Sequence, residues 1–163
     1  MKSVSNIMTR NVRVVSPSDS VIRAAQAMEE LNVGAVPVCD GQRLVGMLTD
    51  RDIVVRGVAQ GMADVDTKVS EIMSREVKWC LQDQPVDEVL GVMSQHQIRR
   101  MPVVDAQHQL VGIVSVGDIA TKAEESPVAD LLSEISETEL EHRAGMLPVK
   151  ARSGNGSTSR RPA

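Results

Sequence analysis

The chain has 163 residues, a formal net charge of −4 and 42% hydrophobic residues. This length suffices for one domain or two small ones, and the charge gives no indication of nucleic-acid binding. Because neither a secretory leader nor an apolar run of transmembrane length is found, we expect a cytoplasmic protein without a membrane partner.

The first half of the chain predicts a strand, a helix, a strand pair and a second helix. Asp19 follows turn-forming residues and is the predicted N-cap of the first helix. Ile22, Ala25, Met28 and Leu31 recur at helical spacing, which predicts the buried face of that helix. An Asp-Gly turn joins the two later strands. The predicted bounds are Val12–Val15, Ser20–Leu31, Val36–Cys39, Leu44–Leu48 and Thr49–Ala59.

The second half repeats this order after a short linker at 62–68. Pro85 is expected at the first position of its first helix, where the missing N–H costs nothing. The apolar spacing of that helix predicts a buried face made of Val86, Val89, Leu90 and Met93. The predicted strands are Val77–Cys80, Met101–Val104 and Leu110–Val114, and Ser115 begins the last helix of the unit.

Matching sequences show that the two halves are copies of one unit. Val4–Arg10 matches Val69–Arg75, and Leu44–Ile53 matches Leu110–Ile119. Such self-similarity indicates two copies of one supersecondary unit, which we expect to share an interface because each is small. We expect unit 1 at 1–61 and unit 2 at 69–123. An acidic helical extension at 124–145 and a disordered tail at 146–163 are expected to follow.

Each copy carries a hydroxyl residue followed three positions later by an aspartate, at Thr49/Asp52 and Ser115/Asp118. The pattern suits a helix cap, in which the hydroxyl accepts an N–H bond and the acid favours the positive end of the helix. It also suits a nucleotide site, because helix starts attract phosphate and an aspartate accepts bonds from ribose hydroxyls. Both interpretations stay open.

These stretches carry a family resemblance. Ile7-Met8-Thr9, Ala35–Asp40 and Gly46–Asp52 resemble a CBS domain in order and spacing, and the second copy ending in Gly112–Asp118 resembles another. The chain thus resembles the small stand-alone bacterial proteins made of one CBS pair. The resemblance covers residues 1 to about 123. It implies an α+β fold of two β-α-β-β-α units related by a pseudo-two-fold axis, and a homodimer.

The resemblance also implies two clefts for an adenine nucleotide (AMP, ADP or ATP) or a related adenosyl ligand. One would use Ser115 and Asp118, with Arg99 or Arg100 toward phosphate and an adenine wall of Val12, Arg13, Val33, Gly34 and Ala35. The other would use Thr49 and Asp52, with Arg51 near phosphate and a wall of Val77, Lys78 and Ile98. Arginine binds phosphate through bidentate hydrogen bonds, which favours the Asp118 cleft. Arg99 and Arg100 equally suit a solvated pair at a helix end.

No catalytic group or metal site is expected. Neither hydroxyl residue has an evident general base. Two cysteines form no disulfide framework, and the Cys39, Cys80, His96, His108 and His142 set lacks metal-ligand spacing. The first hypothesis is a non-catalytic sensor without a required cofactor that signals to an unknown protein partner. The alternative is a stress-related interaction module without a nucleotide, whose motifs serve only as caps.

Overall fold

The structure is a computed structural model that describes residues 2–122, so the predicted extension at 124–145 and tail at 146–163 lie outside the described residues. The strands are β1 Ala35–Asp40, β2 Arg43–Thr49, β3 Cys80–Leu81, β4 Arg100–Val104 and β5 Leu110–Ser115. The helices are η1 Val4–Asn6, α1 Val21–Leu31, α2 Asp50–Asp52, η2 Ile53–Gly57, η3 Val58–Gln60, α3 Val69–Ile72, α4 Val86–Gln95 and α5 Val116–Lys122.

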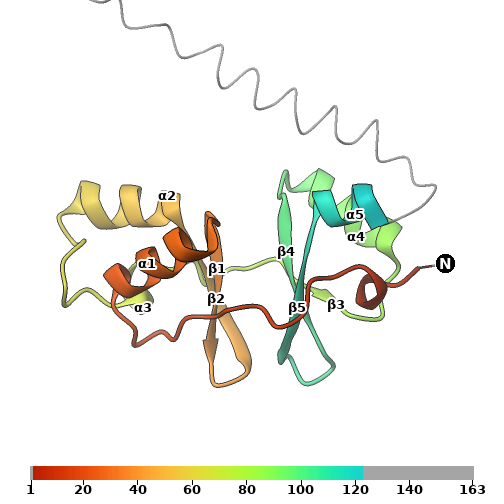
Figure 1. Cartoon of the computed structure of the whole chain (residues 1–163), viewed down its shortest axis with the longest axis horizontal. Helices are drawn as coiled ribbons and strands as arrows, with labels where there is room; N and C mark the ends of the chain where they lie inside the picture. The colour runs from red at the N-terminus through yellow and green to blue at the C-terminus, as the bar shows by residue number, and fades with distance from the viewer. Residues whose placement is uncertain (1, 123–163) are drawn as a thin grey trace, which may run out of the picture.

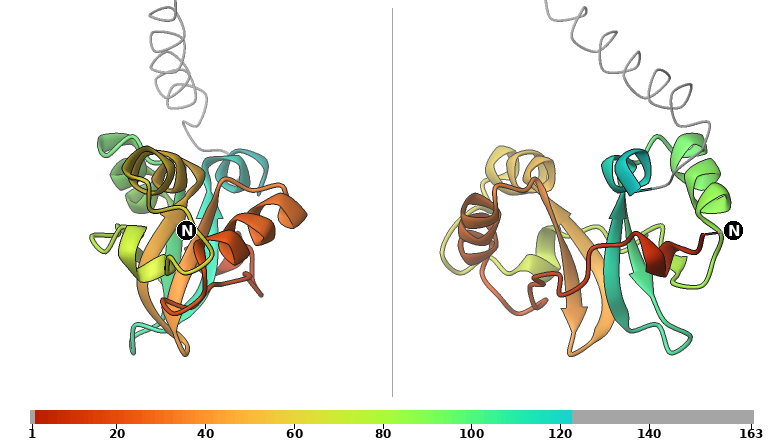
Figure 2. Two further views of the ribbon diagram at one scale, coloured as in Figure 1. Left: turned by 90° about the vertical axis from the view of Figure 1, so that its left-hand side faces the viewer. Right: turned by 45° about the vertical axis from the view of Figure 1, so that its right-hand side comes forward.

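Two antiparallel hairpins form the centre of the molecule (Figure 1). β1 pairs with β2, and β4 pairs with β5 while β3 adds to β4 in parallel. Each hairpin has its register shift at the same place in the repeat, after Val38 in one and after Val103 in the other. Helices α1 and α4 cover the outer sides of the hairpins (Figure 2). The predicted α+β fold of two repeated units is confirmed.

The first strand of each unit is shorter than predicted. The expected strand Val12–Val15 is wrong, because only Val15 pairs, in a single parallel bridge to Val38. Arg13 and Val14 are exposed and have no strand beside them. In the second unit the strand is confined to Cys80–Leu81, which pairs with Val103 and Val104. Pairing therefore begins only where the chain becomes buried.

Three details of the helices also differ from the prediction. Ser20, not Asp19, caps α1 by accepting the Arg23 N–H at 3.2 Å, while the Asp19 carboxylate accepts the Ser16 N–H at 2.8 Å. The buried face of α1 is made of Val21, Ala24, Ala27 and Met28, so the predicted face was right only at Met28. Pro85 is the N-cap of α4 rather than its first residue. The four predicted core positions of α4 are all buried.

The two units exchange their leading segments. Val4 and Ser5 donate backbone bonds to Gln84 and Gln82, at 3.0 and 2.8 Å, so the N-terminal segment lies against the second unit. Reciprocally, the Val69 N–H bonds the Asp19 carbonyl at 2.9 Å, which places α3 against the first unit. Figure 1 shows this crossing. Each hydrophobic core is therefore built from both halves of the chain.

Glycine is required where the exchanged segments cross the hairpins. Ser74 exchanges two backbone bonds with Met47 of β2, each 2.9 Å long, and Thr9 makes the same pair with Ile113 of β5. A Cβ on Gly46 would lie 2.7 Å from the Ser74 oxygen. A Cβ on Gly112 would lie 2.8 Å from the Thr9 oxygen. The glycine repeated in both Leu-Val-Gly stretches therefore permits the backbones to approach.

This exchange predicts that two matched substitutions weaken different units. Ile7 is 2% exposed within the core of the second unit, and Ile72 is 1% exposed within the core of the first. Ile7→Ala and Ile72→Ala should each lower the free energy of unfolding by about 2–5 kcal/mol, since each leaves a cavity. In hydrogen exchange, Ile7→Ala should weaken protection first in β4 and β5, and Ile72→Ala first in β1 and β2. Loss confined to each residue's own repeat would contradict the exchange.

A third cluster joins the hairpins through buried Cys39, Leu44 and Val104. Cys39 is 4% exposed and Cys80, in the second core, is 2% exposed. Burial raises the pKa of Cys39 to about 11 and that of Cys80 to about 12. Both side chains are therefore neutral thiols at physiological pH, as free buried cysteines are expected to be.

We expect both thiols to resist a disulfide reagent at pH about 8 in the folded protein and to react after unfolding. An unfolded thiol ionises near pH 8.5, while the folded thiols stay protonated until higher pH. The free energy of unfolding should consequently fall as pH rises from about 8.5 through these raised pKa values. Labelling rates by mass spectrometry test this, and equally fast labelling of folded and unfolded protein would contradict it.

Candidate functional site

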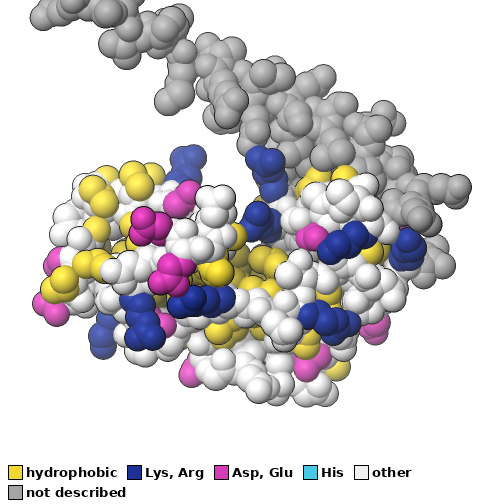
Figure 3. All heavy atoms as spheres, in the orientation of Figure 1, with side chains coloured by type: hydrophobic (Ala, Val, Ile, Leu, Met, Phe, Trp, Pro, Cys, Tyr) yellow, Lys and Arg dark blue, Asp and Glu magenta, His cyan; other side chains and the backbone are white. Residues whose placement is uncertain are grey.

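A cleft lies between the two units. It has a volume of about 1220 Å³, and the first residues of α2 and α5 are part of its lining. Figure 3 looks onto this hollow, with Lys and Arg side chains on both sides of it. The lining residues are Gly34, Ala35, Met47, Thr49, Asp50, Arg51, Ser74, Glu76, Val77, Lys78, Gln97, Ile98, Arg99, Arg100, Pro102, Ser115, Val116 and Gly117.

The repeat explains why these residues meet. In each unit the start of the first hairpin strand pairs with the end of the second: Ala35 pairs with Thr49, and Arg100 pairs with Ser115. Because the units are related by pseudo-symmetry, both strand ends reach the same cleft. The segment after α3, around Glu76, also lines it. The two walls of the cleft therefore come from equivalent parts of the repeat but carry different side chains.

Charge distinguishes the cleft from the rest of the chain. Four cationic side chains line it (Arg51, Lys78, Arg99 and Arg100) against two acidic ones (Asp50 and Glu76). The whole chain has a net charge of −4. Arg99 and Arg100 are adjacent at the start of β4, while the matching positions in the first unit are Gly34 and Ala35. A concave surface with apolar walls and an excess of cationic groups is suited to an anionic organic ligand.

Both hydroxyl–aspartate pairs form capping boxes. The Asp52 N–H donates to the Thr49 hydroxyl and the Thr49 N–H to the Asp52 carboxylate, each at 3.0 Å. The Asp118 N–H and the Ser115 N–H make the same two bonds, also at 3.0 Å. These hydrogen bonds confirm that both pairs cap the helices that follow them. A carboxylate has about four acceptor positions, so a cap leaves room for further donors.

Asp118 has additional partners. Burial favours a higher pKa for its carboxyl, but bonds from the Ser115 hydroxyl at 2.6 Å and the Lys122 amine at 3.0 Å, with the Lys122 charge, outweigh it. The net effect lowers the pKa of Asp118 below its usual range. The carboxylate is therefore ionised at neutral pH, and its stabilising bonds are lost only in acid.

Most predicted site residues lie in the cleft, and five do not line it. Those that line it are Gly34, Ala35, Thr49, Arg51, Val77, Lys78, Ile98, Arg99, Arg100 and Ser115. Val12 lines a separate cavity of about 240 Å³ beside the hairpin turns. Arg13, which pairs with Glu30 at 3.0 Å, Val33, Asp52 and Asp118 line neither cavity.

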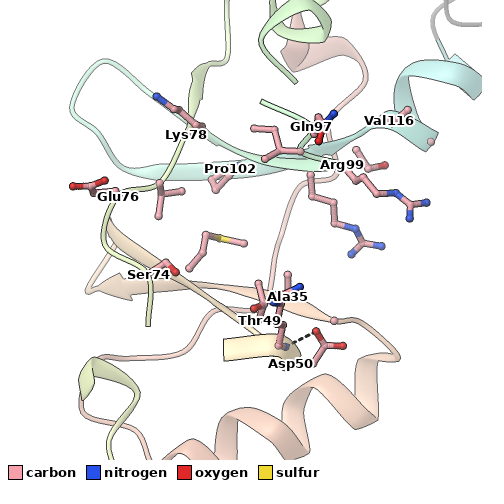
Figure 4. A pocket seen from close by; sticks show the side chains of 18 residues that line it. Ala35, Thr49, Asp50, Ser74, Glu76, Lys78, Gln97, Arg99, Pro102 and Val116 are labelled. Atoms are coloured by element: carbon pink, nitrogen blue, oxygen red, sulfur yellow. Dashed lines mark hydrogen bonds between the residues drawn. The ribbon is translucent and has the colours of Figure 1, made fainter. Parts of the chain in front are cut away.

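The sequence interpretation missed Asp50. Its carboxylate lies on the first-unit wall, 3.0 Å from where a Cβ of Gly34 would stand, and accepts the Arg51 N–H at 2.8 Å. In Figure 4, Asp50 and Thr49 lie on one wall and Arg99 on the facing wall, while Glu76 and Lys78 lie toward the other end. The motif selects only the third residue after the hydroxyl, and no other sequence pattern distinguishes Asp50 from its neighbours.

The described part of the chain holds neither a metal cluster nor a membrane-spanning helix. Within residues 2–122, no three His, Cys, Asp or Glu side chains are placed to hold a metal ion together; His142 lies outside this range. Nor does this range contain a helix long and apolar enough to cross a bilayer.

Comparison with known proteins agrees with the geometry. A family model described as the CBS domain matches residues 4–57 and again 69–125. The chain belongs to the CBS-domain family. This CBS pair is 48% identical over 120 residues to the CBS domain-containing protein YhcV of Bacillus subtilis, covering 74% of the chain and 84% of YhcV. It is 38% identical over 136 residues to hypoxic response protein 1 of Mycobacterium tuberculosis, covering 83% and 94% of the two chains.

Solved structures of CBS pairs share its fold. Hypoxic Response Protein I, whose structure holds two coordinated zinc ions, aligns with a TM-score of 0.67 at 41% identity over 74% of this chain and 98% of the other. CBSX2 in complex with AMP aligns at 0.67 and 27% identity over 76% and 96%. The pair from MJ0100, bound to 5′-methylthioadenosine and S-adenosyl-L-methionine, aligns at 0.61 and 32% identity over 74% and 94%. The chain is thus a CBS pair, a regulatory module.

Proposed function

We propose that this CBS pair is a sensor that binds an adenine nucleotide, or a related adenosyl compound, in the cleft between its units. The observation that carries the proposal is one cavity lined from both repeats by apolar walls, three hydroxyl side chains and an excess of cations. Similar pairs hold AMP, 5′-methylthioadenosine and S-adenosyl-L-methionine, as their structures state. Apolar walls of Ala35, Val77 and Ile98 provide for a base.

The phosphate of the ligand is assigned to the second-unit wall. Arg99 and Arg100 are there, beside Ser115, and arginine forms charge-assisted bidentate bonds with phosphate. Asp118 and Asp52 do not line the cavity, so a role in holding ribose requires a small movement of either carboxylate while its cap is kept. That role stays a prediction, as does the role of Val12, Arg13 and Val33 as an adenine wall.

A ligand in this cleft contacts both units at once and can therefore report their relative placement. The units meet through the Cys39, Leu44 and Val104 cluster and through a backbone bond from Leu110 to Gln42 of 2.9 Å. Binding alters a signal only if the ligand prefers one arrangement of the units over another. A protein partner would then recognise that arrangement.

A second candidate is an interaction module that binds no nucleotide. It is favoured by the complete capping boxes, in which Asp52 and Asp118 already have structural roles. It is also favoured by the exposed apolar side chains of η2 and η3: Val54 is 57%, Val55 48% and Val58 61% exposed. Such a surface suits a protein partner. The homodimer implied by the family resemblance stays a prediction.

A thermal-shift panel separates these two candidates. Purified protein is melted with AMP, ADP, ATP, S-adenosylmethionine and GTP, each at about 100 times its expected dissociation constant. A specific ligand then adds about 2.7 kcal/mol to the free energy of unfolding. Asp118→Ala is melted beside the wild type. A shift with adenine compounds but not GTP supports the sensor; no shift, with Asp118→Ala only less stable, supports the interaction module.

A further inference from the structure

The two walls of the cleft carry their charged side chains at different positions of the repeat. In the first unit, Gly34 has no side chain and the following helix begins with Asp50, whose N–H donates to the Gly34 carbonyl at 2.9 Å. In the second unit the matching pair is Arg99 and Val116, joined by the same backbone bond at 3.0 Å. An anion on one wall thus faces a cation on the other.

The Asp50 side chain is exposed, and one backbone hydrogen bond and the open space at Gly34 set where its carboxylate lies. One oxygen, Oδ1, accepts the Arg51 N–H at 2.8 Å, and the other, Oδ2, lies 3.0 Å from the place where a Cβ on Gly34 would stand. The absence of a side chain at Gly34 therefore makes room for the carboxylate on the cleft wall. Both residues line the cavity, and the carboxylate is on the wall opposite Arg99 (Figure 4).

We propose that Asp50 limits the length of the phosphate chain, so that the cleft takes adenosine compounds with a single phosphate in preference to triphosphates. This rests on the proposed function. With the first phosphate held by Arg99 and Arg100, each added phosphate brings negative charge into the space between the walls, toward Asp50. Like charges repel, so each added phosphate is disfavoured on that side of the cleft.

The opposite preference follows from the cationic side chains of the cleft. Arg99 and Arg100, with Arg51 and Lys78 elsewhere in the cleft, attract more strongly as the ligand gains charge. Without Asp50 a triphosphate would bind best. Asp50 is therefore a specificity-determining residue, and removing its charge should increase the affinity for triphosphates.

The test is the ratio of ATP to AMP dissociation constants, measured by calorimetric titration without divalent ions. Asp50→Asn keeps an acceptor for the Arg51 N–H and removes the charge. It should improve ATP binding relative to AMP by about tenfold, and the change should shrink at high salt because screening weakens it. The matched control is Glu88→Gln, an exposed acid on α4 that does not line the cleft; it should leave the ratio unchanged.

The outcomes separate this inference from the function on which it rests. If the wild type binds AMP and Asp50→Asn leaves the ratio unchanged, the inference is overturned while the sensor stands. An equal change in Glu88→Gln also overturns it, since the effect would then come from total charge. If the wild type binds neither nucleotide, the proposed function fails and the inference fails with it.

Discussion

Gly112→Ala should lower the free energy of unfolding by about 2–3 kcal/mol, which is the upper part of the range for overpacking a well-packed site. The new Cβ would stand 2.7 Å from Met8 Sδ and 2.8 Å from the Thr9 oxygen. The thioether can rotate away, but the Thr9 carbonyl is held by its 3.0 Å bond from the Ile113 N–H. The exchanged N-terminal segment must therefore shift, and the second core with it.

The chain offers a matched control for this substitution. Gly91 lies on the exposed side of α4, and nothing stands within 4 Å of the Cβ that alanine would add. Gly91→Ala should raise the free energy of unfolding by about 0.5–1 kcal/mol, because alanine favours the helix over glycine. Urea unfolding of the three proteins, followed by the fluorescence of Trp79, measures both changes. An increase in stability from both substitutions would contradict the crossing described above.

The Arg99→Ala/Arg100→Ala double variant should weaken AMP binding by about 100-fold or more. Each hydrogen bond to a charged group contributes about 1.5–3 kcal/mol, and two such losses exceed the 2.7 kcal/mol that correspond to 100-fold. Loss of positive charge from the cleft should also reduce the salt dependence of binding. Calorimetric titration at two salt concentrations measures affinity and salt dependence together.

Arg23→Ala is the matched control for the loss of arginine. Arg23 is exposed on α1 and does not line the cleft. Its replacement should leave AMP affinity within about twofold, since distant surface charges are screened. Thermal unfolding of all variants separates loss of affinity from loss of folding. Undiminished AMP binding by the folded double variant would show that these two arginines do not bind the ligand.

The hairpins and α4 were predictable because their signals are local. Alternating or helically spaced apolar residues, an Asp-Gly turn and a hydroxyl cap each specify structure within a few positions. The first strands were not, because Val12–Val15 has strand composition but only Val15 finds a partner. Strand composition reports suitability for a sheet and not the presence of a neighbouring strand.

The exchange of leading segments could not be predicted either. The match between Val4–Arg10 and Val69–Arg75 shows that both segments have one role, but not which unit receives each. Both arrangements bury the same residues, and only long-range contacts distinguish them. The Leu-Val-Gly repeat contained a hint, because a glycine within a buried strand often indicates close approach of another backbone.

The candidate site was predictable in part. The family resemblance selected ten residues that line the cleft, among them Arg99, Arg100 and Ser115. It did not select Asp50, and it placed Asp52 and Asp118 in the site although neither lines the cavity. The capping boxes explain the difference, because each turns its carboxylate back toward the backbone of its own helix start.

Titration of AMP into the purified wild-type protein by isothermal calorimetry tests the central claim most directly. The account predicts saturable binding that weakens with rising salt, as expected for phosphate held by arginine. It also predicts much weaker binding of GMP, as the proposed adenine preference requires. Absence of saturable AMP binding, confirmed by equilibrium dialysis on folded protein, would contradict the sensor and favour the interaction module.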